Sequence, residues 1–310
     1  MRAMQVNNAT QGPVLLAAEV SQPQPGEGEL LIRVRAVGVT PAELHWYPTT
    51  HAKDGGPRKA AVPGHEFSGV IAALGKNTQG FAVGQDVYGM NDWSVEGATA
   101  EFCLALPQSI APKPVTLTHE AAATVPISAL TAWQGLFQRA QIKPGERVLV
   151  HGGAGAVGLF AVQLAHLHGA HVIATAAQRN LKFVAELGAD QVIDYRASRF
   201  EDHSGKVDVV FDTVGGDTLD RSWSILKAAG RLITIFSGLP DNAEQRVKDA
   251  FFIVEASQKQ LLEVASLLDA GTLKTYVNAV VPFAEAADAY TGAVQGKLGY
   301  GKVVIVAPGK

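Results

Sequence analysis

The segment from residue 147 to 158, Arg-Val-Leu-Val-His-Gly-Gly-Ala-Gly-Ala-Val-Gly, constrains the fold of this chain more than any other. An apolar run, Arg147–His151, leads into the spacing G-x-G-x-x-G, and an apolar stretch with few polar residues, Ala156–His168, follows it and predicts a helix. A strand, a glycine-rich turn and a helix in this order form the phosphate-binding unit of dinucleotide-binding domains. The glycines alone are weak support, and a glycine-rich turn that binds nothing is the alternative. With the flanking elements counted we predict a dinucleotide site, whose contacts are Gly153, Gly155, Ala156, Val157 and Gly158.

The next expected strand, His171–Ala176, indicates which dinucleotide is bound. In an NAD site an acidic residue about 20 residues after the glycines hydrogen-bonds the ribose hydroxyls. Here no acidic residue occurs between Leu159 and Ala185, and Thr175 and Arg179 follow instead. A carboxylate would repel a 2′-phosphate, whereas a hydroxyl and a guanidinium would bind and neutralise it. We therefore predict NADP as the cofactor, although a solvated Arg179 at the start of the next helix is the simpler alternative.

The composition is that of a globular enzyme rather than of a nucleic-acid or membrane protein. Of 310 residues, 47% are hydrophobic and 18% charged, and the net charge of −3 argues against nucleic acid as a partner. The single cysteine, Cys103, excludes an intrachain disulfide and a cysteine-cluster metal site. No basic segment followed by a long apolar stretch is visible at the start, and histidines interrupt the most apolar region, so we expect no signal peptide, no transmembrane span and a cytoplasmic location.

The sequence pattern changes along the chain and predicts two domains, as does the length of the chain. Short apolar runs between Gly, Pro and Asn turns predict strands at Leu15–Val20, Leu30–Val37, Phe67–Leu74, Asp86–Met90 and Glu101–Leu106. From Thr118 onward we expect helices at Thr118–Val125 and Ser128–Arg139, then helices alternating with six strands at Arg147–His151, His171–Ala176, Gln191–Tyr195, Val207–Phe211, Arg231–Phe236 and Phe251–Val254. That alternation predicts an α/β domain with a doubly wound parallel sheet. The expected tail, which returns to the first domain, is helix Ser257–Ala270, strand Tyr276–Pro282, helix Glu285–Gln295 and strand Lys302–Val306.

Several motifs resemble those of the medium-chain dehydrogenase/reductase superfamily, in particular its zinc-free quinone oxidoreductase and enone reductase branch. They are Pro63-Gly64-His65-Glu66-Phe67-Ser68-Gly69-Val70, Val83-Gly84-Gln85-Asp86-Val87-Tyr88-Gly89, Ala129-Leu130-Thr131-Ala132-Trp133, the glycine segment and Gly301-Lys302-Val303-Val304. The resemblance covers nearly the whole chain. It implies a β-rich GroES-like catalytic domain, residues 1–118 and 255–310, and an inserted Rossmann domain, residues 119–254. In that family the active site lies between the two domains.

The resemblance also raises the question of a catalytic zinc ion. This sequence keeps Gly64-His65-Glu66, whose histidine is a zinc ligand in the alcohol dehydrogenases. The position that matches the first cysteine ligand is Thr40, and the position that matches the third ligand is Ile127. One histidine cannot build a three-ligand site. We therefore expect no metal, and we expect His65 to be a hydrogen-bonded residue.

Without a Lewis acid, an activated C=C bond or a quinone is a more suitable hydride acceptor than a simple carbonyl. The expected function is therefore NADPH-dependent reduction of a small-molecule quinone or α,β-unsaturated carbonyl. The resemblance places His45 and Tyr47 as catalytic proton donors, each of which is equally well explained as a hydrogen-bonded wall residue. It also implies further cofactor contacts at strand ends and on one helix: Thr131, Tyr195, Thr213, Val214, Phe236, Ser237, Phe252 and Ile253.

Two other functions remain open at this point. One is a zinc-dependent alcohol dehydrogenase with a degenerate site built from His65, Glu66 and Glu43. The other is an NADPH-binding protein without turnover. Because an apolar strand at Phe251–Val254 would lie at a sheet edge, we also expect a homodimer joined through that edge.

Overall fold

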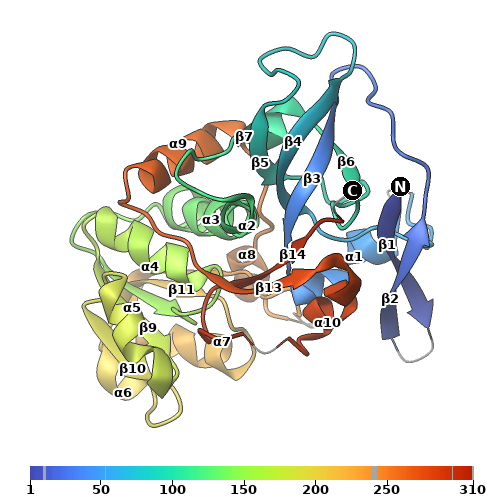
Figure 1. Ribbon diagram of the computed structural model, residues 1–310. Helices are drawn as coiled ribbons and strands as arrows, with labels where there is room; N and C mark the ends of the chain where they lie inside the picture. Colours follow the sequence, from blue (N-terminus) through green and yellow to red (C-terminus); the bar gives the residue numbers. More distant parts are fainter. Residues whose placement is uncertain (10–11, 53, 239–242, 295, 309–310) are drawn as a thin grey trace. The chain divides into compact units, whose positions relative to one another are not determined.

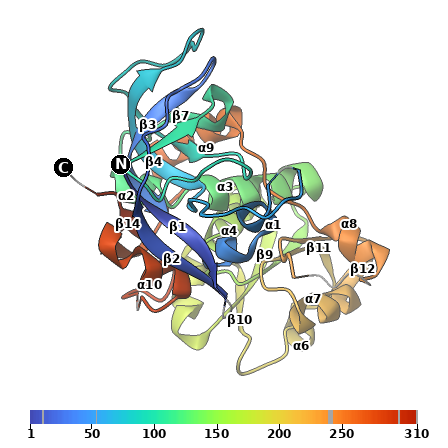
Figure 2. The same ribbon diagram turned by 90° about the vertical axis from the view of Figure 1, so that its right-hand side faces the viewer.

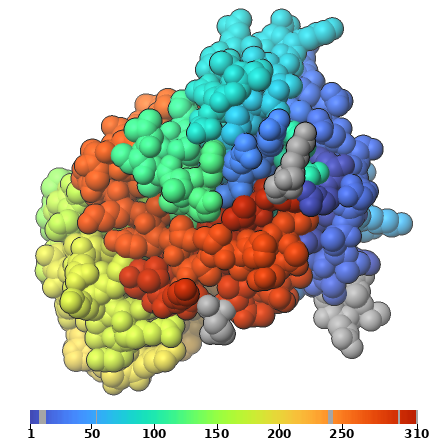
Figure 3. All heavy atoms as spheres, viewed as in Figure 1, coloured from blue at the N-terminus to red at the C-terminus, as the bar shows by residue number. Residues whose placement is uncertain are grey.

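The computed structural model describes residues 1–9, 12–52, 54–238, 243–294 and 296–308. Contacts divide the chain into two units, Met1–Ile127 with Glu255–Lys310, and Ser128–Val254. Both chain ends thus belong to the first unit, where Figure 3 shows the red C-terminal segment beside the blue N-terminal one. No described helix is long and apolar enough to cross a bilayer.

The first unit is built on a mixed sheet with the order β13-β14-β3-β4-β5-β7, and β6 pairs with β3 as well (Figure 1). Its strands are β1 (Arg2–Ala9), β2 (Gly12–Glu19), β3 (Leu30–Gly38), β4 (Glu66–Leu74), β5 (Asp86–Met90), β6 (Phe102–Ala105), β7 (Ile110–Pro112), β13 (Val277–Pro282) and β14 (Lys302–Val306). Its helices are η1 (Pro41–His45), α1 (Tyr47–Thr50), η2 (Pro107–Ser109), α2 (His119–Ala122), α9 (Gln258–Asp269), η6 (Phe283–Glu285) and α10 (Ala286–Thr291). Strands β1 and β2 form a separate antiparallel pair.

Strand β3 organises this sheet because three strands pair with it. It pairs with β4 along nearly its whole length on one side. On the other side β6 pairs with its first half, from Leu30 to Arg33, and β14 pairs with its end, from Ala36 to Gly38. The apolar side chains of these strands make one buried cluster with those of α10, among them Ile32, Phe67 and Ile305.

The second unit is a five-stranded parallel sheet with the order β10-β9-β8-β11-β12 (Figure 2). The strands are β8 (Arg147–His151), β9 (His171–Ala176), β10 (Gln191–Asp194), β11 (Val207–Asp212) and β12 (Leu226–Thr234). The helices are α3 (Pro126–Trp133), which continues as the π-helix η3 (Gln134–Arg139), then α4 (Gly158–Leu167), η4 (Gln178–Asn180), α5 (Leu181–Glu186), α6 (Glu201–Ser204), α7 (Asp217–Ser222), η5 (Trp223–Ile225) and α8 (Gln245–Ala250). Helix α4 packs on β8 and β9, and α7 and α8 pack on β12. The predicted doubly wound α/β fold and the β-rich first unit are both confirmed.

Strand order reverses between β8 and β11, because β9 lies on one side of β8 and β11 on the other. Ligands of doubly wound sheets bind at such a reversal, outside the carboxyl ends of the strands. The strands are continuous apolar runs because both sheet faces are covered, and Val148, Leu149 and Val150 of β8 are fully buried.

The predicted sixth strand, Phe251–Val254, is wrong. Phe251 makes a single parallel bridge with Thr234, and the Phe252 amide donates to the Thr234 carbonyl at 3.4 Å. Thr234 is the last residue of β12, so the neighbouring strand offers no further length for pairing. Ile253 is 61% exposed. The expected homodimer therefore stays a prediction, without the strand edge on which it was based.

Residues 119–127, which the sequence analysis assigns to the nucleotide-binding domain, fall in the first unit. The His119 ring nitrogen Nδ1 lies 2.8 Å from the Ser68 hydroxyl, and the Ile127 amide donates to the Glu66 carboxylate at 3.1 Å. Both contacts hold this stretch to β4. The predicted tail is found in the order expected, with α10 ending at Thr291, while Gln295 lies outside the described residues.

Candidate functional site

The loop after β8 can be built only with glycines. Gly152 adopts a left-handed backbone with φ of 74°, so the sharp turn falls on this residue and not on Gly153 as the motif suggests. A Cβ on Gly158, the first residue of α4, would lie 2.1 Å from the Gly152 carbonyl oxygen. A Cβ on Gly155 would meet only that same oxygen, at 3.2 Å, so the space beside Gly155 is otherwise open. The motif thus provides a turn, a close helix approach and room for a ligand beside the backbone.

Backbone amides at the start of α4 are available to a ligand. In the described part of the chain, the amides of Ala156 and Val157 have no hydrogen-bond acceptor. They precede a ten-residue helix, whose N-terminus carries a partial positive charge. Because β8 borders the reversal of strand order, these donors lie at the ligand-binding edge of the sheet. The residues present therefore fit the pyrophosphate of a dinucleotide.

A buried carboxylate shapes the loops after β11 and β12. Asp212, fully buried at the end of β11, accepts hydrogen bonds from the amides of Val214 and Gly215 at 3.0 and 3.1 Å and from the Thr234 hydroxyl at 2.8 Å. The Thr234 hydroxyl in turn accepts from the Phe236 amide at 3.1 Å. One side chain thus orders two neighbouring loops, a role that sequence reasoning missed because Asp212 resembles any acid at a strand end.

The loops ordered by Asp212 carry four predicted cofactor residues. Thr213 donates its hydroxyl to the His151 carbonyl at 2.7 Å. Val214 is 49% exposed, Ser237 is exposed and Phe236 is half-buried. All four lie at the carboxyl edge of the sheet, where the resemblance places them.

Of the two residues expected to recognise a 2′-phosphate, Thr175 is buried and Arg179 is exposed. Thr175 is 3% exposed, and its hydroxyl contacts the Gly152 amide at 3.1 Å and His151 Nδ1 at 3.3 Å. Arg179, on η4, is exposed. Tyr195 follows β10 and is 54% exposed, and its amide donates to the carbonyl of Ala176, the last residue of β9, at 3.3 Å.

A second arginine accompanies these residues. The Arg196 guanidinium lies over the Tyr195 ring, 5.6 Å from its centroid. Sequence reasoning missed Arg196, although its position directly after Tyr195 at a strand end was the available signal. The ends of β9 and β10 therefore present two arginines and a tyrosine.

The remaining predicted contacts lie elsewhere in the second unit. Thr131 is buried in α3. Phe252 is half-buried with the Arg139 guanidinium over its ring, and Ile253 is exposed. The role of these three residues in cofactor binding stays a prediction.

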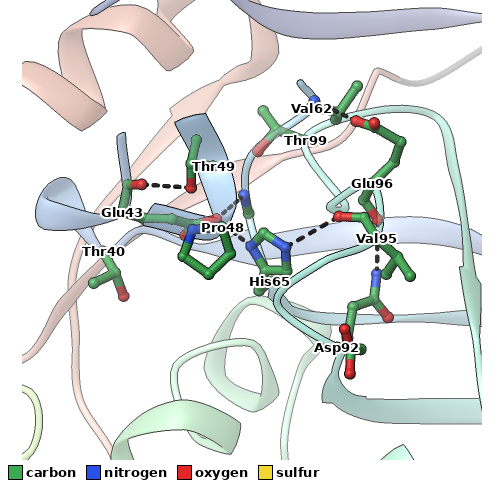
Figure 4. A network of polar contacts seen from close by, with 12 residues as sticks. Thr40, Glu43, Pro48, Thr49, Val62, His65, Asp92, Val95, Glu96 and Thr99 are labelled. Atoms are coloured by element: carbon green, nitrogen blue, oxygen red, sulfur yellow. Dashed lines mark hydrogen bonds and ion pairs between the residues drawn. The ribbon is translucent and has the colours of Figure 1, made fainter. Parts of the chain in front are cut away.

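The first unit holds a buried ion pair between Glu43 and His65 (Figure 4). Glu43 Oε1 lies 2.5 Å from His65 Nδ1 and accepts from the Gly64 amide at 2.7 Å. His65 Nε2 lies 3.3 Å from the Val95 carbonyl oxygen, so both ring nitrogens face acceptors. Burial lowers the pKa of His65. The Glu43 carboxylate and the Val95 carbonyl raise it by more, so the net shift is upward. A doubly protonated ring satisfies both acceptors, so His65 is an imidazolium.

A second buried ion pair joins Glu66 to Lys302. The Lys302 ammonium contacts Glu66 Oε1 and lies 3.4 Å from the Thr40 hydroxyl. Glu66 Oε2 accepts from the Ile127 amide. Burial raises the pKa of Glu66, and the ammonium opposes that rise. The sequence motif that contains Lys302 left its partner unspecified, and the structure shows a salt bridge to Glu66.

These residues do not fit a catalytic metal ion. The His65 nitrogen that would coordinate it faces the Val95 carbonyl, Ile127 supplies no donor side chain, and an ammonium stands beside Thr40 and Glu66. Among the residues that the structure describes, no three His, Cys, Asp or Glu side chains are grouped as ligands. A cation that already pairs with Glu66 would repel a second one.

Both predicted proton donors, His45 and Tyr47, are exposed and follow Glu43 closely in the sequence. His45 ends η1, and Tyr47, 62% exposed, begins α1. The Tyr47 ring stacks on His51 with centroids 4.2 Å apart. Trp93 lies edge-on to Trp46 at 5.1 Å and 5.3 Å from the His65 ring. Sequence reasoning did not identify Trp93 or His51, because no motif marks either residue.

Comparison with known proteins gives consistent relatives. Residues 26–109 match the alcohol dehydrogenase GroES-like domain, and residues 187–305 match a family described as zinc-binding dehydrogenase. A probable zinc-binding oxidoreductase, mitochondrial, of Arthroderma benhamiae is 34% identical over 90% of this chain and 88% of its own. The quinone oxidoreductase of Mus musculus is 30% identical over 99% and 98%, and the 2-methylene-furan-3-one reductase of Solanum lycopersicum is 30% identical over 94% and 74%. The structure of the quinone oxidoreductase from Coxiella burnetii has a TM-score of 0.86 and 28% identity, with 99% of each chain covered.

The Glu43–His65 pair should make stability depend on pH. We expect Glu43→Gln to lower the free energy of unfolding by about 3 kcal/mol near pH 6, because it leaves a buried partner unpaired. Folded His65 holds its proton above pH 6.5, the ordinary pKa, whereas the unfolded ring has lost it, so the wild-type advantage decreases as pH rises through the folded-state pKa. Urea unfolding between pH 6 and 9 measures this, with the exposed Glu27→Gln as control. Parallel pH profiles for wild type and Glu43→Gln would contradict the imidazolium assignment.

Chelator treatment should leave the protein unchanged. Because Lys302 neutralises Glu66, dialysis against EDTA is expected to alter neither the melting temperature nor cofactor binding. Elemental analysis of protein purified without added metal should show far less than one zinc per chain. One tightly held zinc per chain would overturn this expectation.

Proposed function

Because the chain belongs to the medium-chain dehydrogenase/reductase superfamily, we propose that it is an NADPH-dependent oxidoreductase that reduces quinones or α,β-unsaturated carbonyls without a metal ion. The single observation that carries the metal-free part is the Lys302 ammonium in contact with Glu66 and near Thr40. Thr40 is the position that matches a cysteine ligand in zinc-dependent members of the family. The Lys302 ammonium therefore lies beside residues that correspond to the metal site of those members.

The relatives support the proposed class of substrate. The mouse and Coxiella burnetii proteins are described as quinone oxidoreductases, and the tomato protein as a reductase of a 2-methylene-furan-3-one, a conjugated ketone. Quinones and conjugated ketones share an oxygen that is conjugated to the carbon at which hydride adds. Such an acceptor delocalises the developing charge itself and needs less help from a Lewis acid.

The proposed cofactor preference rests on charge at the ends of β9 and β10. A phosphate on the adenosine ribose carries up to two negative charges, and arginine binds phosphate through a planar fork of donors. Arg179 and Arg196 are both exposed there, beside Tyr195. The loop amides of Ala156 and Val157 would hold the pyrophosphate, which both nicotinamide dinucleotides share.

When bound, the reduced nicotinamide supplies the hydride. The chain's own contribution is to hold the flat acceptor and to provide a proton for its oxygen. His45 and Tyr47 carry N–H and O–H groups on exposed side chains, so either can donate without first breaking a buried bond. The imidazolium of His65 is committed to Glu43 and Val95 and acts by fixing the loop that carries His45.

We expect NADPH to bind more tightly than NADH. Arg179→Ala should remove most of this preference, about a tenfold loss in NADPH affinity, because one charge-assisted contact is lost at an exposed site. NADH affinity should stay within twofold. Lys182→Ala is the matched control. It also removes one positive charge, but from α5, the helix that follows Arg179, and from a side chain that is paired with Glu186. Equal affinity of the wild type for both cofactors, measured by fluorescence titration, would remove the argument.

We expect quinones and conjugated enones to be reduced, and simple alcohols and unconjugated ketones to react poorly. Replacing His45 or Tyr47 by Phe should lower turnover by about 10²-fold for the residue that donates the proton, with little change in NADPH affinity. NADPH oxidation against a panel of acceptors measures both. If acetone or ethanol reacts faster than every conjugated acceptor, the substrate class is wrong, and if nothing reacts while NADPH binds, the protein is a binding protein.

A further inference from the structure

A continuous chain of hydrogen bonds runs from the glycine loop through the sheet to α7. The Gly152 amide lies 3.1 Å from the Thr175 hydroxyl, which lies 3.3 Å from His151 Nδ1. On the other side of the ring, His151 Nε2 lies 3.0 Å from the Ser222 hydroxyl, which donates to the Thr218 carbonyl at 2.6 Å. The three side chains of this chain, from Thr175, His151 and Ser222, are each at most 3% exposed.

The direction of every proton in this chain follows from its far end. Ser222 has one hydroxyl proton and gives it to the Thr218 carbonyl, so its oxygen can only accept from His151. His151 therefore carries its proton on Nε2. Its Nδ1 is then an acceptor, so the Thr175 hydroxyl donates to it, and the Thr175 oxygen accepts from the Gly152 amide.

The His151 ring is neutral near pH 7. Burial, together with the positive charge of Arg221, lowers the pKa of His151 to about 3, although the Glu201 carboxylate opposes the shift. A neutral ring has one donor and one acceptor, which is what its two neighbours require. The chain is thus completely satisfied within the protein.

Thr175 also holds the loop through its backbone. Its carbonyl accepts from the Gly153 amide at 2.9 Å, next to the bond between its hydroxyl and the Gly152 amide. The carbonyl of His151, just before these two amides, accepts from the Thr213 hydroxyl. Three successive residues of the turn are therefore fixed, and the two bonds to Thr175 orient the free amides that follow.

We propose that Thr175 is a positioning residue for the glycine loop, with its hydroxyl oriented by His151 and Ser222, and that it does not recognise the 2′-phosphate. This assignment replaces the expectation from sequence that Thr175 and Arg179 share that phosphate. It rests on the proposed function, because the loop is the cofactor's phosphate site. It follows that loss of the Thr175 hydroxyl should weaken the binding of NADPH and of NADH by the same factor.

Thr175→Val and Thr175→Ser test the proposal, since valine keeps the shape without the hydroxyl and serine keeps the hydroxyl. Fluorescence titration of NADPH and NADH should show that Thr175→Val weakens both by about three- to tenfold, the effect of one hydrogen bond. Their ratio should stay within twofold of the wild type, whereas Thr175→Ser should restore both affinities. A loss confined to NADPH, or no loss with either cofactor, would overturn the proposal.

A second measurement is made on the wild-type protein, so it does not depend on whether Thr175→Val folds. Nitrogen-15 NMR of wild-type protein, with the His151 signals assigned by comparison with His151→Gln, should show the Nε2–H tautomer from pH 6 to 8. The Nδ1–H tautomer or an imidazolium would overturn the proposal. The proposed function fails separately, if the wild type binds neither cofactor.

Discussion

The buried contact between Glu66 and Lys302 joins the starts of β4 and β14, the two strands between which β3 lies. A carboxylate and an ammonium removed from water each lose several kcal/mol of hydration, and only good geometry and further hydrogen bonds offset that loss. Here the Ile127 amide and the Thr40 hydroxyl complete the pair. Since Glu66 begins β4 and Lys302 begins β14, the pair fixes the ends of two strands that both lie beside β3. The Glu43–His65 pair next to it in sequence is oriented by the same turn, through the Gly64 amide.

Sequence patterns predicted the parts of the fold that depend on local signals. Continuous apolar runs identify β8, β9 and β11, because strands covered on both faces need no alternation. The glycine spacing predicted the glycine-rich loop between β8 and α4, but the residue of this loop with a left-handed backbone is Gly152, which lies just before the motif. The run Phe251–Val254 was apolar enough for a strand, but pairing needs a partner of matching length, and β12 ends at Thr234. The length of the neighbouring strand cannot be read from the sequence of the segment itself.

The site residues show the same limit. Thr175 and Arg179 are close in sequence and were predicted to bind one phosphate together. Both faces of β9 are covered, however, so the Thr175 hydroxyl lies in the interior, whereas Arg179 lies beyond the strand and is exposed. His151, Asp212 and Lys302 acquire their roles from partners 22 to 236 residues away. Such long-range pairings follow from the topology of the sheet, and no local pattern specifies them.

The place of β14 in the first sheet has a consequence for synthesis on the ribosome. Residues 128–254 are complete, and can fold as a unit, before β14 has been made, because chains are built from the N-terminus and domains fold as units. Until then the end of β3 has an unpaired edge and Glu66 lacks its counter-ion. Until β14 has left the exit tunnel, the nascent first unit therefore has a sheet edge that is open to wrong pairing. Chain order thus makes the inserted unit the earlier one to mature, and the unit that begins the chain the later one.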